Sequence, residues 1–380
     1  PTARPRTGQR FPASIASPRW HLWDNAGYRQ DGITHIYAQA AERIPGERRE
    51  ERYWRAYWRH FSSPDEGHTW IDEGPALRPR AGSGGSDAKA IWSGSVTVLP
   101  DGRKLAAYTG LAAGHRALQS ISLAVSADGR EFDRLAGSHP LLSPIIDYDR
   151  LRDLGYYLGE RATLGDDASE ADGTFMALRD PFLFRHDGRL HMLFGAKAGE
   201  GSSVTRAVGH AIVREPIADA ECELLPPIEL PDGHEFNMLE VPNVMRHDGV
   251  YYLVISTARL AHLGQSDLET QRSVRVYRSA ALETGWQPYG DGGAHVILGP
   301  ESKLYGLSII GEQDWYPSAG THAELLVDLA SFIERDAYRS YTSGLLASDT
   351  ETCFHATLSA LPGVTWSGGA ETRRFTEEWD

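Results

Sequence analysis

The chain repeats one short unit, in which a carboxylic acid precedes an Asp-Gly dipeptide that separates two β-rich runs. In "RDPFLFRHDGRLHML" Asp180 stands seven residues ahead of Asp187, and in "EVPNVMRHDGVYYLV" Glu240 stands eight ahead of Asp248. Asp-Gly favours the type I′ turn of a β-hairpin, because that turn needs positive φ at both central residues. The repeated unit therefore predicts a chain of β-hairpins with an acid at a fixed place on the first strand.

Further turn signals extend this pattern over most of the chain. Asp-Gly occurs, for example, at residues 31, 101, 128, 187, 232, 248 and 291, with short runs such as "SVTVLP" and "YYLVIST" between these sites. Helical periodicity is limited to "HAELLVDLASFIER" (322–335) and, more weakly, "IIDYDRLRDLGYYLG" (145–159). Evenly spread hairpins, 39 glycines and few helices are typical of an all-β repeat architecture.

A five-bladed β-propeller suits a chain of 380 residues better than the other all-β folds. "SPDEGHTW" (63–70) matches the Asp-box turn found on the outer hairpins of many propellers, with Trp70 expected between blades. A β-sandwich would need a second domain to use up the chain. We expect one propeller domain over residues 1–380, with residues 1–15 as a flexible N-terminal arm.

The repeated acids are expected to meet in one pocket. In "WDNAGYRQDGITHIYAQA" Asp24 also stands seven residues ahead of its turn, whereas in "WSGSVTVLPDGRKLAAYTG" Trp92 and Ser93 take the place of the acid. The innermost strand of each propeller blade lines the central channel, so a residue seven or eight positions before the turn lies at the head of that strand. Asp24, Asp180 and Glu240 should therefore converge from three blades on an axial pocket.

Three acids at similar offsets indicate a shared site, although a single Asp at a strand start is usually a turn or capping residue. Their apolar flanks suggest burial, and buried carboxylates are costly unless they are paired or have shifted pKa values. Clustered carboxylates without metal ligands are typical of glycosyl transfer, where one ionised acid attacks the anomeric carbon and a protonated one protonates the leaving oxygen. The neighbouring Trp23, Trp92 and Arg179 suit a sugar, which binds to aromatic faces and charged groups.

The composition disfavours several other classes of protein. The formal net charge of −14 argues against a nucleic-acid partner, and no apolar run approaches the ~18 residues of a membrane span. The chain has no Gly-rich phosphate loop, no H-E-x-x-H and no metal-type Cys/His spacing, so we expect neither a cofactor nor a metal. Cys222 and Cys353 are expected to be free thiols. The N-terminal "PTARPRTGQRFPAS" lacks an initiator Met and an apolar signal core, so it does not indicate a compartment.

At these residues the chain resembles the fructosyl-transferring five-bladed propellers: glycoside hydrolase family sixty-eight (levansucrases, inulosucrases and bacterial β-fructofuranosidases) and its invertase relatives. Trp23-Asp24 matches the Trp-Asp nucleophile motif, "WSGS" (92–95) the W-S-G-S motif, and "RDP" (179–181) the Arg-Asp-Pro motif. "EVPNVMRHDGVYYL" matches the acid/base segment, and Arg259 falls on a substrate-binding Arg of the family. The order and spacing of the motifs agree over residues 20–260.

The resemblance implies a retaining double displacement on sucrose or a related fructoside, without a cofactor and in a secreted or periplasmic setting. It assigns the chemistry to Asp24 as nucleophile, Asp180 as transition-state stabiliser and Glu240 as acid/base. It assigns substrate binding to Trp23, Trp92, Ser93, Arg179 and Arg259. The chain departs from the family at "WDNAGY", at Met238 and at "FGAKA", where levansucrases often carry other polar groups. These departures leave the acceptor and the ratio of hydrolysis to transfer open.

Two other functions remain open at this point. One is an arabinan- or xylan-directed glycosidase, which shares the five-bladed fold and the three-acid pocket but inverts the anomeric centre. The other is a sugar-binding propeller without catalysis. Sialidases share the Asp-box, but their Tyr nucleophile and three clamping arginines are disfavoured by acids on the inner strands.

Overall fold

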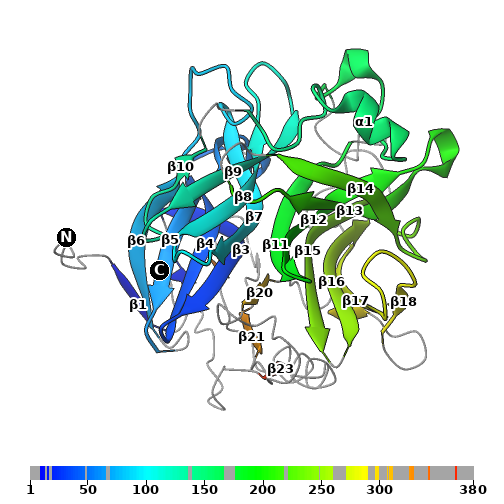
Figure 1. Cartoon of the computed structure of the whole chain (residues 1–380). Coiled ribbons are helices and arrows are strands. Elements are labelled where there is room, and N and C mark those ends of the chain that lie inside the picture. The colour runs from blue at the N-terminus through cyan, green and yellow to red at the C-terminus, as the bar shows by residue number, and fades with distance from the viewer. Residues whose placement is uncertain are drawn as a thin grey trace.

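The described part of the chain folds as an all-β propeller (Figure 1). The computed structural model describes residues 9–12, 15–16, 19–47, 49–65, 69–135, 139–166, 176–217, 221–247, 249–259, 271–289, 296–298, 306, 308–310, 325–328, 341–342 and 364–365. Within these residues, four antiparallel sheets of four or five strands follow one another along the chain. Each sheet is one blade, and the first long strand of each blade is its innermost strand.

The strand boundaries follow the β-rich runs of the sequence. The first blade contains β3 (Trp20–Gln30), β4 (Ile33–Glu42), β5 (Tyr57–Ser63), β6 (Thr69–Leu77) and the edge strand β1 (Arg10–Pro12). The second contains β7 (Ala90–Val98), β8 (Lys104–Leu111), β9 (Gln119–Ser126) and β10 (Asp133–Arg134). The third contains β11 (Arg179–His186), β12 (Arg189–Ala198), β13 (Thr205–Val213) and β14 (Cys222–Glu229). The fourth contains β15 (Met238–His247), β16 (Val250–Arg259), β17 (Gln271–Ser279), β18 (Gln287–Pro288) and β19 (Val296–Leu298).

The inner hairpins of the first three blades turn at an Asp-Gly dipeptide, as the sequence predicts. Asp31 and Gly32 have φ values of 54° and 73°, and Asp187 and Gly188 have 47° and 76°, so both turns have the two positive φ angles of type I′. In the second blade Gly102 has positive φ, and its N–H donates to the Leu99 carbonyl at 2.8 Å. An Asp-Gly dipeptide therefore predicts the position of the hairpin correctly even in the second blade, where the turn is not of type I′.

The blades pack face to face through apolar clusters. Trp58 and Tyr108 belong to the cluster between the first and second blades, and Phe194 to the one between the second and third. Tyr251 and Tyr277 belong to the cluster between the third and fourth. Middle strands such as β8 are buried along their whole length, because a blade is covered on both faces, and their sequences read as nearly continuous apolar runs.

The Asp-box forms the turn between β5 and β6. Asp65 Oδ1 accepts the Thr69 N–H at 2.7 Å, and Asp65 Oδ2 accepts the Thr69 hydroxyl at 2.7 Å. Trp70 is buried in a cluster with residues of its own blade and with Ile15 of β2 (Ile15–Ala16), so among the described residues it packs within the first blade and not, as expected, between blades.

The inner strands lie side by side in the order β3, β7, β11, β15, and β20 (Ser308–Ile310) contacts both β15 and β3. β20 pairs with β21 (Leu325–Asp328), which also pairs with β23 (Val364–Thr365). A further two-stranded sheet joins β2 to β22 (Tyr341–Thr342). The described residues thus form four complete blades rather than the five expected, because most of residues 299–380 lie outside the described part.

The two helix predictions had different outcomes. The weaker one, over residues 145–159, is confirmed only at Tyr148–Asp153, which forms α1 in the connection from β10 to β11. The stronger one, over residues 322–335, is wrong at Leu325–Asp328, which forms β21, and its other residues lie outside the described part. There the apolar run pairs with two other strands, so tertiary contacts override the local helical periodicity.

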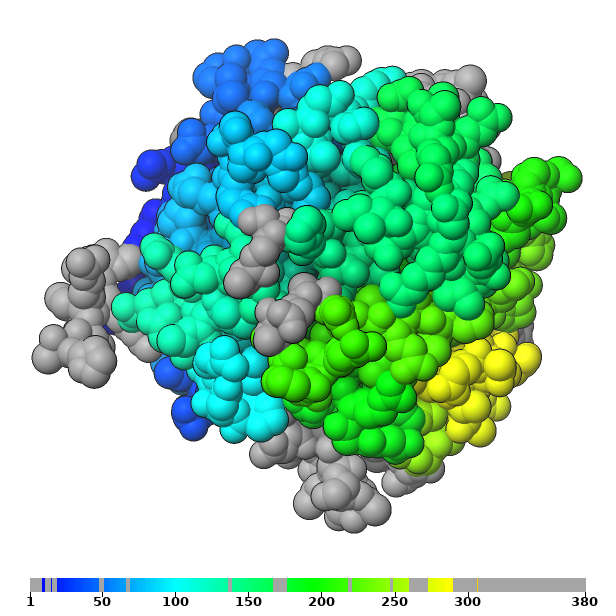
Figure 2. All heavy atoms as spheres, turned by 45° about the horizontal axis from the view of Figure 1, so that its top comes forward, coloured from blue at the N-terminus to red at the C-terminus, as the bar shows by residue number. Residues whose placement is uncertain are grey.

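Long connections cover the faces of the blades. Figure 2 shows the described part of residues 139–166, in blue-green, spread between the cyan second blade and the green third blade. Leu151, Tyr156 and Leu164 of this connection join the cluster between those blades. No helix in the described ranges has the length and apolar character that a membrane span requires. Cys222 is a buried free thiol, and Cys353 lies outside the described residues.

The third blade contains a buried histidine pair that should make the fold sensitive to acid. His191 Nδ1 and His210 Nε2 are 2.9 Å apart, and burial lowers the pKa of His191 to about 4 and that of His210 to about 3. From pH 6.5 down to about 4 the unfolded chain therefore binds more protons than the folded chain, so the free energy of unfolding should fall with pH.

Chemical denaturation between pH 7 and pH 4 should reveal this dependence. We expect His191→Gln/His210→Gln to lose less stability over this range than the wild type, because glutamine can hydrogen-bond but does not titrate. The exposed His234→Gln is the control and should keep the wild-type slope. Equal slopes for the double variant and the wild type would contradict the prediction.

Candidate active site

A β-bulge interrupts each of the four inner strands at the same level. The pairing with the second strand of the blade shifts between Trp23 and Asn25, between Ile91 and Gly94, between Arg179 and Phe182, and between Glu240 and Asn243. At each shift the inner strand has one residue more than its partner. Bulges of this kind bend a strand and redirect its side chains, and they are common beside active sites.

The bulges explain why the acids do not share one offset. Asp24, Asp180 and Val241 have φ values of 28°, 57° and 49°, which are unusual for residues other than glycine. All three stand seven residues ahead of the Asp of the turn. Val241 is therefore the counterpart of Asp24 and Asp180, whereas Glu240 corresponds to the residue before them. The expectation of equivalent positions holds for two acids and is corrected for the third.

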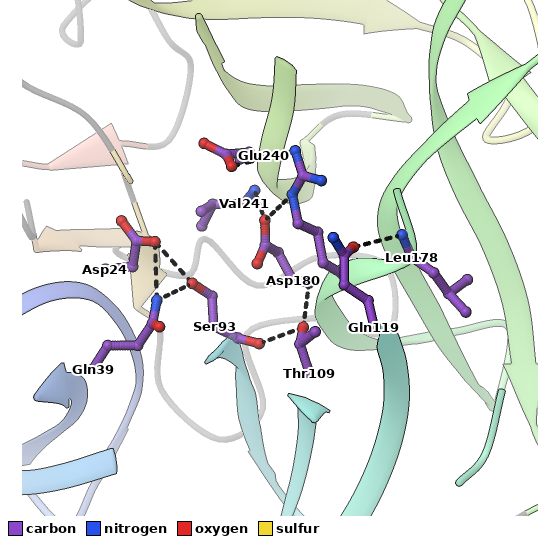
Figure 3. Close-up of polar contacts among 10 residues, drawn as sticks. Asp24, Gln39, Ser93, Thr109, Gln119, Leu178, Asp180, Glu240 and Val241 are labelled. Carbon is purple, nitrogen blue, oxygen red and sulfur yellow. Dashed lines mark hydrogen bonds and ion pairs between the residues drawn. The ribbon is translucent and has the colours of Figure 1, made fainter. Parts of the chain in front are cut away.

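Asp24 is oriented by two polar side chains from neighbouring strands (Figure 3). Gln39 Nε2 donates to Asp24 Oδ2 at 3.1 Å and to Ser93 Oγ at 2.6 Å, and Ser93 Oγ donates to Asp24 Oδ2 at 2.8 Å. Gln39 lies on β4 opposite Trp23, and Ser93 lies at the bulge of β7. These hydrogen bonds fix the direction of the carboxylate.

Asp180 is held from both sides of the bulge of β11. Its backbone N–H donates to Thr109 Oγ1 at 2.8 Å, and the Thr109 hydroxyl donates to the Ser93 carbonyl at 3.0 Å. Its Oδ2 accepts the Val241 N–H at 3.2 Å. Hydrogen bonds therefore connect the second, third and fourth blades at this level.

Arg179 joins the second and third acids. Its Nη2 lies 3.3 Å from Glu240 Oε1, and its Nε lies 3.7 Å from Asp180 Oδ2. Arg179 and Asp180 are 3% and 5% exposed, whereas the Glu240 side chain is 23% exposed. Glu240 is thus the more accessible of the two acids that Arg179 contacts.

Burial raises the pKa of Asp180 to about 8. The positive charge of Arg179 opposes this shift, and the negative charges of Glu240 and Asp24 add to it. Arg179 contacts two of the three acids, so a single positive charge faces two carboxyl groups. Asp180 therefore favours its protonated form in the free protein.

The aromatic residues of the sequence prediction lie beside the acids. Trp23 is buried, 5.8 Å from the ring of Tyr53 and under the Arg52 guanidinium. Trp92 is half-buried, and its Nε1 donates to the Tyr53 carbonyl at 2.8 Å. Residues 49–55, the 3-10 helix η1, thus support both tryptophans.

Arg259 is further from the cluster along the strand. It ends β16, three residues past Ser256, which lies opposite Glu240, and its side chain is exposed. This position places Arg259 at the rim rather than among the buried acids.

Sequence reasoning missed Gln39 and Thr109. Each is a single buried polar residue within an apolar run, "IYAQAA" for Gln39 and "AAYTGL" for Thr109. A buried polar side chain needs a partner, so an isolated polar residue on a strand next to an inner strand was the available signal.

A small cavity lies between the four inner strands. Each strand contributes residues to its lining, among them Gly27, Ser95, Asp180 and Asn243. Among the described residues, no group of three or more His, Cys, Asp or Glu side chains is arranged to hold a metal ion.

Asp180→Asn should stabilise the fold at high pH. Because the pKa of Asp180 is raised from 3.8 to about 8, the folded wild type binds more protons than the unfolded chain between these values and loses stability as pH rises. Asparagine removes this loss, so the gain in free energy of unfolding should be small at pH 4 and exceed about 1 kcal/mol at pH 8.

Urea denaturation at pH 4, 6 and 8 measures this gain. Asp31→Asn, a change at an exposed turn where Asn is equally suitable, should leave the pH profile unchanged. A gain from Asp180→Asn that is the same at all three pH values would contradict the assignment of the raised pKa to Asp180.

Comparison with known proteins identifies related sequences and folds. Residues 45–153 match the model of the Glycosyl hydrolases family 32 N-terminal domain, a stretch that includes Trp92 and Ser93 but none of the three acids. A beta-fructofuranosidase of Arabidopsis thaliana, insoluble isoenzyme CWINV3, is 34% identical over 106 residues. This match spans 26% of the chain and only 17% of that relative. A second isoenzyme, CWINV6, is 38% identical over 92 residues, which are 24% of this chain and 15% of that protein.

The fold extends the likeness over most of the chain. An inulosucrase from Halalkalicoccus jeotgali bound to kestose matches with a TM-score of 0.56 and 21% identity, over 88% of this chain and 80% of that one. The levansucrase of Bacillus subtilis matches with a TM-score of 0.59 and 15% identity, over 86% and 83%. The resemblance to the propeller clan of invertases and levansucrases, predicted from the motifs, is therefore confirmed by a partial sequence match and by the fold.

Proposed function

We propose that this chain is a retaining β-fructosyl-transferring glycoside hydrolase that acts on sucrose or a related fructoside. The observation that carries the proposal is the arrangement of the three acids. Asp24 receives hydrogen bonds from Gln39 and Ser93, whereas Arg179 bridges Asp180 and Glu240. The Asp24 carboxylate is thereby oriented by two neutral donors, next to two acids that share one arginine.

In the proposed first step, an oxygen of the Asp24 carboxylate attacks the anomeric carbon of the fructosyl group. The bond from that carbon to the leaving oxygen breaks, and the proton of Glu240 goes to the leaving sugar. In the second step Glu240, now ionised, takes a proton from water or a sugar hydroxyl. The oxygen of that water or hydroxyl attacks the anomeric carbon, and the bond between this carbon and the Asp24 oxygen breaks.

Asp180 is assigned to the fructosyl hydroxyls, where its charge stabilises the oxocarbenium-like transition state. The pKa of Asp180 is raised in the free protein. A bound sugar must therefore favour the ionised form of Asp180, through hydrogen bonds that the sugar hydroxyls donate to the carboxylate. Trp23 and Trp92 are assigned to the walls of the fructosyl subsite. Ser93 and Arg179 are assigned to its polar groups, and Arg259 to the rim.

The propeller is inferred to close as five blades around an axial pocket. The support is that β20 contacts both β15 and β3, so one more inner strand lies between the fourth blade and the first. The resemblance also supports one domain over residues 1–380 and a secreted or periplasmic setting.

Loss of any of the three acids should lower turnover strongly. We expect Asp24→Asn and Glu240→Gln to lower kcat on sucrose by several orders of magnitude, and Asp180→Asn by ~100-fold or more, because a pre-organised charge contact has at least this effect. Asp31→Asn keeps the fold and should keep wild-type kcat. If Asp180→Asn retained more than about a tenth of wild-type turnover, the assignment of the pocket would be wrong.

Incubation with sucrose, followed by chromatography of glucose, fructose and oligomers, tests the substrate class. We expect release of glucose, with a bell-shaped dependence of the rate on pH, because one acid must be ionised while another is protonated. Absence of glucose at every pH would exclude the proposal. Release of arabinose from arabinan would then favour the inverting alternative, and sugar binding without turnover would favour the non-catalytic one.

Hydrolysis should predominate over polymer synthesis. Met238 and the "FGAKA" segment, in which Lys197 is buried, replace groups that could hold an acceptor sugar. Fewer acceptor contacts favour attack by water. We expect mainly free fructose at low sucrose and short oligosaccharides at high sucrose. Abundant ethanol-precipitable fructan from concentrated sucrose would contradict this prediction and leave the catalytic assignment intact.

A further inference from the structure

Gly306 stands two residues ahead of β20 and contacts residues of the first and fourth blades. It is buried, and its φ of +72° lies in the region that favours glycine. Its backbone N–H donates to Ser256 Oγ at 3.0 Å. Ser256 is itself fully buried and lies opposite Glu240 in the pairing of β15 with β16. Gly306 is therefore anchored to the strand pair that carries Glu240.

The other side of Gly306 faces Asp24. A Cβ atom added to Gly306 would lie 2.4 Å from Asp24 Oδ1 and 3.3 Å from Asp24 Cγ. Cβ atoms essentially never approach another heavy atom closer than 3.0 Å, so one of the two groups would have to move. The carboxylate could turn away only by straining the hydrogen bonds that Oδ2 accepts from Gln39 and Ser93.

We propose that Gly306 is a positioning residue for the Asp24 carboxylate, and that its missing side chain lets the carboxylate keep the direction set by Gln39 and Ser93. The proposal rests on the function proposed above, in which Asp24 attacks the substrate. A carboxylate turned by a methyl group would no longer point along the line of attack. A misplacement of about 1 Å costs about 100-fold in rate.

Any substitution of Gly306 also strains the backbone, and a second glycine separates this strain from the steric effect. Gly32, in the turn after the strand that carries Asp24, has a φ of +73° with no atom within 4 Å of an added Cβ. Gly32→Ala therefore introduces the same backbone strain without the contact. It lies at the far end of β3 from Asp24 and has no part in the proposed site.

A double-mutant cycle tests the contact itself. The free energy of unfolding is measured for Gly306→Ala and Gly32→Ala, each in the wild-type and the Asp24→Ala background. We expect Gly306→Ala to destabilise the wild type more than Gly32→Ala does. In the Asp24→Ala background the two changes should cost the same, because the carboxylate is gone. If Gly306→Ala did not fold but the double variant Gly306→Ala/Asp24→Ala did, this result would also show that the two positions are coupled.

Kinetics on sucrose test the consequence of the contact. Gly306→Ala should lower kcat by about 100-fold with little change in KM, whereas Gly32→Ala should keep both close to wild type. An excess cost of Gly306→Ala that persists without the Asp24 carboxylate would overturn the proposal, and so would an unchanged kcat. The stability measurements need no substrate. If the wild type were inactive on sucrose, the proposed function would be wrong, but the double-mutant cycle would still show whether Gly306 and the Asp24 carboxylate are in contact.

Discussion

One extra residue at the same level of four neighbouring inner strands is the constraint on which the site depends. In a regular strand adjacent side chains point to opposite faces, so an acid and the residue next to it could not serve one pocket. At a bulge two consecutive residues share one cross-strand partner, and the strand bends. Asp24 is the extra residue between the paired Trp23 and Asn25, and Asp180 and Pro181 lie between the paired Arg179 and Phe182, where β12 has one residue. The left-handed backbone of Asp24, Asp180 and Val241 is the local cost of this arrangement.

The electrostatics of the site follow from bringing these bulges together in a buried place. Asp180 is almost inaccessible, and one guanidinium, that of Arg179, contacts both it and Glu240. Asp24 relies instead on the neutral donors of Gln39 and Ser93. The acids therefore have different environments, and different environments are what allow similar groups to act as nucleophile, stabiliser and proton donor. The raised pKa of Asp180 also means that the folded protein becomes less stable where that group ionises.

The site is assembled from residues of all four described blades. Asp24 comes from the first blade, its donor Ser93 from the second, Asp180 from the third and Glu240 from the fourth. Gly306 belongs to the segment between the fourth blade and the first, and it contacts elements of both. No single blade contains a working set of groups, so a change in the packing between blades would misplace the acids relative to one another. The apolar clusters between blades thus position the three acids as well as stabilise the fold.

The sequence by itself determined the hairpins, the all-β class, the order of the three acids and the resemblance to fructosyl-transferring propellers. These depend on short-range signals: Asp-Gly turns, alternating apolar runs and motifs of a few residues. Only the tertiary structure decided that Val241 rather than Glu240 is the counterpart of Asp180, and that Gln39, Thr109 and Gly306 surround the acids. It also decided that Leu325–Asp328 is a strand within an apparently helical run. The positions of the bulges and the hydrogen-bond partners of the acids depend on which strands lie next to one another in the propeller. Residues far apart in the sequence determine that arrangement.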